Sequence, residues 1–319
     1  MRIDTMTYLN TSLTGIQSNQ SAIARLNQQI ASGLIMQSTK DDPVTSVKAM
    51  ELSNRIAVRT QYAANQDKAE LDLNYETAVT REMSSALNQA RALLTGISSS
   101  HSASLRNMHA EQLKGVFNHV LDLANTRDPA GNYIFSGFET ATKPFANTST
   151  ATVPATVVAT TYSGTAAPGG VRNIEVESGR FVQANDNLSD VFNFTDASIV
   201  DPAQGGATHD VLENLADAIV NLPLAVTEAD LKGYMDVLDV ALTNLSLKEH
   251  RIAGALTEIK DVRKSTESLL LLEKNALSDM TQVDKAAAIV ELQSRQTSLE
   301  AISRAYSLTS GLSLFNYLG

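Results

Sequence analysis

Cysteine and tryptophan are absent from this sequence of 319 residues, and aromatic residues make up only 5% of it. The lack of cysteine excludes disulfides, thiol catalysis and thiolate metal sites. No apolar run approaches the ~20 residues that a membrane span needs, so no membrane insertion is expected. The N-terminus has no basic region followed by an apolar stretch, so we also expect no cleaved signal peptide.

Charge is scarce at both ends of the chain. The 25 basic and 35 acidic residues give a net charge of −10, which argues against nucleic-acid binding. Residues 175–240 hold 13 acidic and two basic residues, whereas Arg25 is the one charge between Asp4 and Lys40 and none follows Arg304. Because exposed helix faces usually carry Lys and Glu, the ends are predicted to become covered. The alternative is that they are neutral solvated ends.

A heptad pattern marks the first segment, where four aliphatic residues recur every seven positions: Leu9, Ile16, Ile23 and Ile30. A companion seam is expected through Met6, Leu13, Gln20, Asn27 and Leu34. Gly33 can end this helix, and Asp42 with Pro43 can begin the next as N-cap and first helical residue.

The stretch from Pro43 to about Ser98 contains no further proline and predicts a helix of about 50 residues, roughly 75 Å long. Its expected apolar side comprises Val47, Met50, Leu71, Tyr75, Val79, Met83, Leu87, Leu94 and Ile97. Serines break the pattern at 98–102, and a further helix is predicted from about Ser104 to Asn125.

The middle of the chain changes from helical to strand-like patterning. Residues 133–135 follow a Gly-Asn turn signal and predict a strand, as do Ile174 to Val176 and Phe181 with Val182. A strand is also expected around Val157, Val158, Thr160 and Tyr162. We therefore expect a small β-rich insertion over residues 138–206.

Helical patterning returns after the insertion. Capping-box patterns at 210–213 and 227–230 predict two helix starts. A heptad seam then runs through Leu231, Leu238, Leu245, Ile252 and Ile259, with a second through Met235, Leu242, Leu256 and Leu270. The last stretch carries Leu292, Leu299 and Tyr306 at sevens, beside Ile289 and Ile302. An unpartnered apolar stripe is unfavourable in water, so the two ends of the chain should pair.

The predicted fold class is mainly α: a long antiparallel helical coiled-coil rod formed by the N- and C-terminal segments, with a small β-rich inserted domain. Residues 1–40 and 275–319 would form a terminal helical assembly domain, and residues 41–137 and 207–274 a helical rod domain.

Catalytic and metal-binding patterns are scarce. No HExxH, GxSxG, GxGxxG or GxxxxGK[ST] motif occurs. The five histidines, His101, His109, His119, His209 and His250, are interpreted as solvated helix residues. The basic residues of the late helix alternate with acidic ones, which favours a solvated, salt-bridged face: Lys248, Arg251, Lys260, Arg263 and Lys264. We expect no catalytic, metal-binding or cofactor-binding residues.

Three segments resemble a known family. The run LNQQIASGLIMQSTKDDPVTSVKAMELSNRI is similar to the start of the flagellin superfamily. GNYIFSGFETATKPF, at residues 131–145, resembles its hook-associated branch, and SGLSLFNYL, at 310–318, resembles a member at the hook–filament junction. The resemblance covers roughly residues 1–145 and 207–319.

The resemblance implies a structural, non-enzymatic protein of the bacterial flagellum, outside the cell, in a zone between hook and filament. The implied partners are other copies of the chain, the first hook-associated junction protein, flagellin and a flagellar export chaperone. Export would proceed unfolded through the type III channel, and the paired terminal helices would line the central channel of the assembly.

We hypothesise that the chain ends order only on assembly, because ordering each residue costs ~1–2 kcal/mol of backbone entropy. The residues expected to pack within and between subunits are Leu9, Leu13, Ile16, Ile23, Ile30, Leu299, Tyr306, Leu308, Leu312, Leu314, Phe315 and Tyr317. Three alternatives stay open: a flagellin filament subunit, an enzyme carried in the insertion, and a free-standing coiled-coil adaptor.

Overall fold

The computed structural model describes residues 2–36, 38–147, 160–166, 170–203, 207–224 and 226–318. The expected residues Val157 and Val158 lie outside these ranges. In chain order the described elements are α1 Arg2–Ser32, α2 Pro43–Thr95, α3 Ala103–Ala124, β1 Phe145–Asn147, β2 Thr160–Tyr162, β3 Asn173–Glu177, β4 Arg180–Gln183, α4 Ser189–Phe192, β5 Asn193–Thr195, β6 Thr208–Asp210, α5 Val211–Asn221, α6 Glu228–Thr281 and α7 Lys285–Leu318. The mainly α class with a small β-rich insertion is confirmed.

The chain forms two compact units, each with its own internal contacts. One unit comprises Met1–Arg59 and Ser268–Gly319, and the other comprises Thr60–Glu267. Both units therefore draw on α2 and α6, the two longest helices. The unit formed by residues 60–267 is called the central unit below, and the other the terminal unit. The domain division expected from the sequence stays a prediction.

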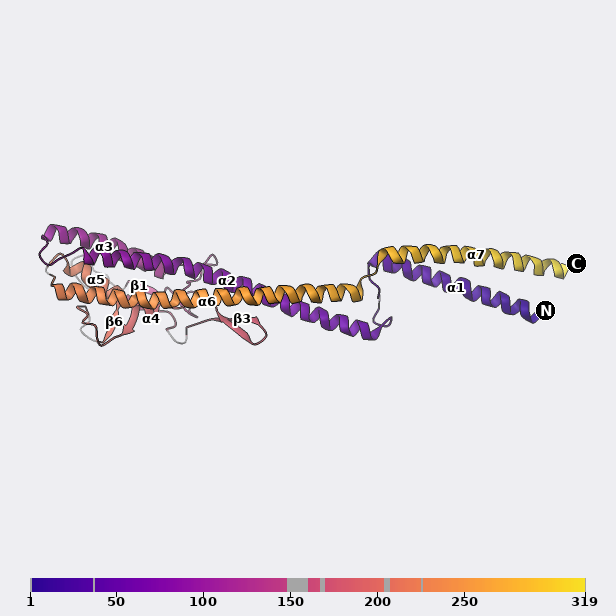
Figure 1. Ribbon diagram of the computed structural model, residues 1–319, viewed down its shortest axis with the longest axis horizontal. Helices are drawn as coiled ribbons and strands as arrows, with labels where there is room; N and C mark the ends of the chain where they lie inside the picture. Colours follow the sequence, from indigo (N-terminus) through magenta and orange to yellow (C-terminus); the bar gives the residue numbers. More distant parts are fainter. Residues whose placement is uncertain are drawn as a thin grey trace. The chain divides into compact units, whose positions relative to one another are not determined.

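The core of the central unit lies between α2, α3, α5 and α6 (Figure 1). The predicted heptad seam of α6 is confirmed, since all five of its residues are at least 98% buried: Leu231, Leu238, Leu245, Ile252 and Ile259. From α2, Met83, Leu87 and Leu94 are fully buried. Ser84 Oγ donates to Glu249 of α6 at 2.8 Å, so polar contacts flank the apolar seam.

Helix ends follow the predicted capping chemistry. Asp42 Oδ1 accepts from the backbone N–H of Val44 at 3.1 Å and of Thr45 at 3.0 Å, which fixes the start of α2 at Pro43. Asp210 accepts from two backbone N–H groups at the start of α5. Thr227 and Asp230 bond each other reciprocally before α6. Side-chain acceptors thus satisfy backbone donors that have no partner inside the helix.

The prediction of one buried apolar side along α2 is wrong in part for the single chain. Val47, Met50 and Leu71 are more than half exposed, and Tyr75 is 40% exposed. A straight α-helix turns by about 20° per heptad relative to a strict seven-residue repeat. Over a helix of 53 residues this drift moves the buried stripe, so one fixed seam cannot stay covered along its whole length.

Among its described residues, the insertion contains three antiparallel two-stranded pairings, β1–β2, β3–β4 and β5–β6. The strands expected around Ile174 and Phe181 are confirmed as the β3–β4 hairpin, with Ile174 opposite Val182. Val176 and Val182 pack with Ile252 and Ile259 of α6 in a second core cluster. The hairpin is therefore anchored on the helices by one face.

The strand predicted at residues 133–135 is wrong. Tyr133 N donates to Thr140 O at 2.8 Å, and Ile134 N donates to Thr126 O at 3.2 Å, which holds these residues in a compact turn. Phe135 is fully buried in the main core. Tertiary burial has overridden the strand propensity of these aromatic and β-branched residues.

Candidate assembly interface

A short joint ties the two ends of the chain together in the terminal unit. The backbone N–H of Ile35 donates to Thr281 O at 2.8 Å, and that of Val283 donates to Gly33 O at 3.0 Å. Gly33 has a φ of 73°, a left-handed conformation that suits glycine at a helix end. The joint places the end of α1 beside the start of α7, so the two helices run antiparallel, with the start of α1 and the end of α7 at the far end (Figure 1).

The two terminal helices contact each other through a mixed seam. Asn19 Nδ2 lies 3.5 Å from Ser298 Oγ, and a Cβ placed on Gly15 would lie 3.6 Å from Ile302 Cδ1. Gln29 is 91% buried and donates to Ile35 O at 2.6 Å. Polar groups inside such a seam fix its register and reduce its stability.

The structure places the predicted packing residues unequally. Five are half-buried on the terminal helices α1 and α7: Ile16, Ile23, Ile30, Leu299 and Tyr306. Leu13 is 42% exposed and Leu308 is 70% exposed. The side chains of the remaining five lie outside the described residues: Leu9, Leu312, Leu314, Phe315 and Tyr317. Their assignment to packing within or between subunits stays a prediction.

The companion seam expected on α1 is displaced by one position. Asn19 is buried and Leu26 half-buried, whereas the expected Gln20 and Asn27 are exposed. The next turn of the heptad would have placed Leu34 on the seam, but this residue is 44% exposed in the joint, after the helix has ended. The sequence showed a polar interruption in the stripe but not which of two adjacent polar residues would turn inward.

Apolar side chains are also exposed elsewhere in the terminal unit. Val290 of α7 is 67% exposed, and on α2 Val44, Val47 and Met50 are 64–68% exposed. On the paired side, Arg55 and Arg59 of α2 hold Glu273 of α6, with N–O distances of 2.6 and 3.0 Å. One side of this part of α2 is thus fixed by ion pairs, while apolar groups lie in water on another.

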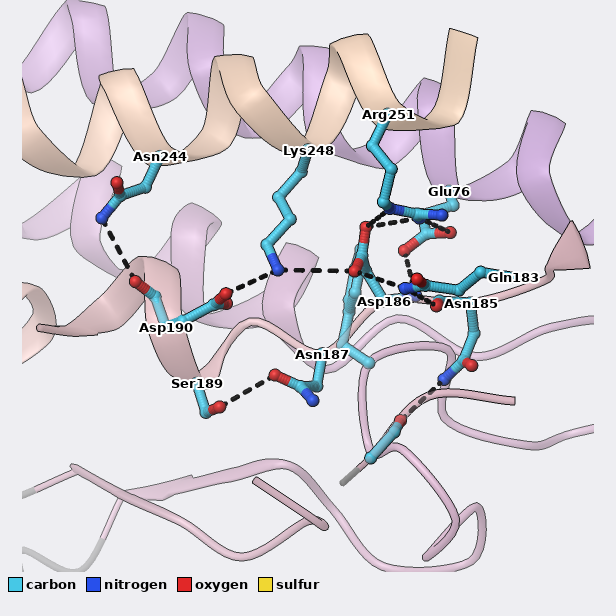
Figure 2. A network of polar contacts seen from close by, with 12 residues as sticks. Glu76, Gln183, Asn185, Asp186, Asn187, Ser189, Asp190, Asn244, Lys248 and Arg251 are labelled. Carbon is cyan, nitrogen blue, oxygen red and sulfur yellow. Dashed lines mark hydrogen bonds and ion pairs between the residues drawn. The ribbon is translucent and has the colours of Figure 1, made fainter. Parts of the chain in front are cut away.

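The central unit contains polar groups that the sequence analysis missed. Lys248 and Arg251, predicted to form a solvated face, reach from α6 to the buried Asp186, which also donates its backbone N–H to Glu76 of α2 (Figure 2). Glu76 and Asp186 are each 98% buried. Glu76 falls within the helical apolar pattern by position, which is the one signal that could have found it.

The interpretation of all histidines as solvated helix residues is wrong for His209. This residue lies in β6 and is fully buried. Its Nε2 donates to Asp196 O at 2.8 Å, and its Nδ1 lies 3.1 Å from Asp201 Oδ2. His209 therefore fixes the loop between β5 and β6.

In the part of the chain that the structure describes, no cluster of three or more His, Cys, Asp or Glu has a geometry that could hold a metal ion. Over the same residues, no helix combines the length and apolar character needed to cross a bilayer. The features that remain are the terminal helix pair, its exposed apolar groups and the nearly uncharged ends.

Comparison with known proteins gives this arrangement a class. Residues 3–140 match the family described as the bacterial flagellin N-terminal helical region. A solved structure of a putative flagellar hook-associated protein from Vibrio parahaemolyticus has the same fold, with a TM-score of 0.64 and 19% sequence identity, covering 76% of this chain and all of that one. In fold and in its N-terminal sequence the chain therefore resembles the class of flagellin-like helical proteins.

Within that class the similarity is to one particular protein. The chain is 25% identical to flagellar hook-associated protein 3 of Escherichia coli (strain K12), over 99% of both chains. It is 24% identical to flagellar hook-associated protein 3 of Salmonella typhimurium, again over 99% of both. The similarity to hook-associated protein 3 therefore covers 99% of the chain and includes the insertion, which lies outside the segments that carry the family resemblance in the sequence.

Proposed function

We propose that the chain is a structural component of the bacterial flagellum, forming the junction zone between a hook-associated protein and the flagellin filament. The observation that carries this proposal is the end-to-end similarity to hook-associated protein 3. A shared terminal region alone would fit any flagellin-like chain, but here the similarity covers 99% of both chains. The proposed role is mechanical and not catalytic.

The terminal unit supplies the proposed mode of assembly. Leu308 and Val290 expose apolar side chains on a helix with few charges, which is costly for a chain that stays alone in water. Contacts with neighbouring subunits would cover these groups and order the helices, so that folding of the ends and assembly become one event. The proposed partners are other copies of the chain, the first hook-associated junction protein and flagellin.

Delivery to this position follows from the same proposal. The chain would leave the cell through the flagellar type III export channel, held beforehand by an export chaperone at its C-terminal region. Ends that order only on assembly suit this route, because they delay polymerisation until the chain reaches the growing tip. In the assembly, α1 and α7 would line the central channel and the insertion would lie at the surface.

A deletion strain tests the junction role. Loss of the gene is expected to abolish swimming and to release flagellin into the medium, with hooks still present on the cells. The strain carrying the wild-type gene is the control. Unchanged motility and filament retention in the deletion strain would refute the proposal, and long filaments formed by the purified chain alone would favour a flagellin subunit instead.

A single substitution tests whether exposed apolar groups of α7 act between subunits. Leu308→Asp should leave the stability of the monomer within about 0.5 kcal/mol, since the side chain is 70% exposed there. Filament retention in the complemented deletion strain should nevertheless fall. Ser303→Asp, an exposed position on the same helix, is the matched control. Full retention with Leu308→Asp would show that this residue makes no essential contact between subunits.

A further inference from the structure

The carboxyl group of Glu76 lies at the junction of three elements in the central unit. It projects from α2, is 98% buried, and its Oε1 accepts the backbone N–H of Asp186 at 2.7 Å. Asp186 belongs to residues 183–190, which run from the end of β4 into α4 and are called the docking segment below. Glu76 therefore binds the docking segment directly to α2.

The second oxygen of Glu76 has no comparable partner. In the described part of the chain, Glu76 Oε2 forms no hydrogen bond, and a terminal nitrogen of Arg251 lies 4.0 Å from it. A buried carboxylate normally gains several charge-assisted hydrogen bonds, because an ionised group without them is costly to bury. One donor at Oε1 and none at Oε2 fit a neutral acid better than an anion.

The cations of this site are committed to other carboxylates. Arg251 Nε donates to Asp186 Oδ2 at 2.8 Å, and Lys248 Nζ donates to Asp190 Oδ2 at 2.6 Å and to Asp186 Oδ1 at 3.4 Å. Figure 2 shows both side chains descending from α6 onto the docking segment. Both cations thus donate their hydrogen bonds to aspartates, and Arg251 faces Glu76 Oε2 only across 4.0 Å.

The remaining side of Glu76 borders a small polar cavity of about 10 Å³, room for about one water molecule. Asp72 of α2, Asp128 and Arg172 line this cavity together with Glu76. Burial raises the pKa of Asp72, against the attraction of Arg172 and Lys68. Counted over all the elements that meet here, carboxylates outnumber cations.

We propose that Glu76 is a neutral carboxylic acid in the native fold, and that its proton serves as a pH-sensitive latch that keeps the docking segment bound to α2 and α6. Loss of the proton would place a second buried negative charge beside Asp186, where Arg251 and Lys248 already bind Asp186 and the partly exposed Asp190. The docking segment would then bind less firmly, because Asp186 is its buried anchor. This inference concerns the attachment of the insertion and does not depend on the proposed role in the flagellum.

The direction of the pH effect follows from linkage. Burial and the neighbouring Asp186 raise the pKa of Glu76 from 4.5 to about 8, against the attraction of Arg251 and Lys248. Between these two values the undocked form releases a proton that the docked form keeps. Docking is therefore strongest below pH 4.5, weakens by up to about tenfold per pH unit up to about pH 8, and then levels off.

Carboxyl carbon NMR of the full chain measures the protonation directly. In wild-type protein labelled at glutamate, one carboxyl resonance that disappears in Glu76→Gln should titrate with a midpoint near pH 8. Glu111→Gln, which removes an exposed carboxyl on α3, should remove a different resonance and leave the one that titrates near pH 8 in place. A Glu76 midpoint near 4.5 would overturn the proposal, and this measurement on the wild type holds even if a variant folds poorly.

Amide exchange measures the latch itself. The amide N–H of Asp186 donates a hydrogen bond to Glu76. Its protection factor should fall by up to about tenfold per pH unit between pH 4.5 and about pH 8 in the wild type. In Glu76→Gln, which keeps the shape without an ionisable group, it should be nearly constant, and Glu111→Gln should follow the wild type. A wild-type protection factor that does not change over this range would also overturn the proposal.

Discussion

Two glycines of α6, Gly233 and Gly254, have very different surroundings. A Cβ built on Gly233 would lie 2.3 Å from Val200 O and 2.7 Å from Pro202 Cδ. A Cβ built on Gly254 would meet nothing within 4 Å. The first glycine lets the backbone after β5 approach the helix, whereas the second has no close neighbour that requires it.

These surroundings predict opposite effects of alanine. Gly233→Ala should destabilise the chain by about 2 kcal/mol, because a backbone carbonyl and a proline ring must move. Gly254→Ala should stabilise it by about 0.5–1 kcal/mol, since alanine lowers the entropy of the unfolded chain. Urea unfolding of the two variants beside the wild type measures both effects. Equal stability of the two variants would contradict this account.

His209 gives a second prediction for a single residue. Removing the ring in His209→Ala leaves the fully buried Asp201 without one of its partners and frees Asp196 O, so a loss of about 3 kcal/mol is expected. Urea unfolding measures it, with the exposed His250→Ala as the control, which should change stability by less than about 0.5 kcal/mol. A loss below about 1 kcal/mol in His209→Ala would mean that water replaces the contact.

Single residues were also where sequence reasoning reached its limit. The partners of His209 and Glu76 could not be predicted, since they lie 8–13 and 110 positions away in the chain. The end caps, by contrast, were predictable, because Asp42 contacts residues only two and three positions away. Interactions between near neighbours can be read from spacing, whereas those that fix the insertion to the helices cannot.

At the scale of elements, the heptad seam of α6 could be predicted because the repeat and the burial have the same period. The fixed apolar side proposed for α2 failed because the buried stripe drifts around a long helix, and Val47 and Met50 ended in water. The strand prediction for residues 133–135 was wrong for another reason. Its aromatic residues favour a strand locally, but Phe135 is buried in the core by contacts from distant helices.

The two terminal helices should be the least protected elements of the free chain. Their seam contains Asn19 and Gln29, and Ile16 and Ile23 are only half-buried, so little apolar area opposes local unfolding. Amides of α1 and α7 are expected to exchange at least about tenfold faster than those near Leu238 and Leu245 of α6. Strong protection throughout α1 in the monomer would contradict ordering on assembly.

At the scale of the whole molecule, the two units should be separable in function. A chain shortened to residues 43–281 keeps α2 to α6 complete and should retain the helical circular dichroism and cooperative unfolding of the central unit. It should fail to restore filament retention to the deletion strain, because the ends are missing. Full-length protein expressed at the same level is the control, and retention equal to it would disprove assembly through the ends.

The joint between α1 and α7 also bears on when the molecule is completed. It brings together residues 33–35 and 281–283, and Asn19 meets Ser298 across 279 positions of sequence. In a chain that emerges with its N-terminus first, α1 therefore has no partner helix until α7, near the end of the chain, has emerged. The contacts of the central unit can close earlier. The order in which the chain emerges therefore makes the surfaces proposed to join subunits the last to form.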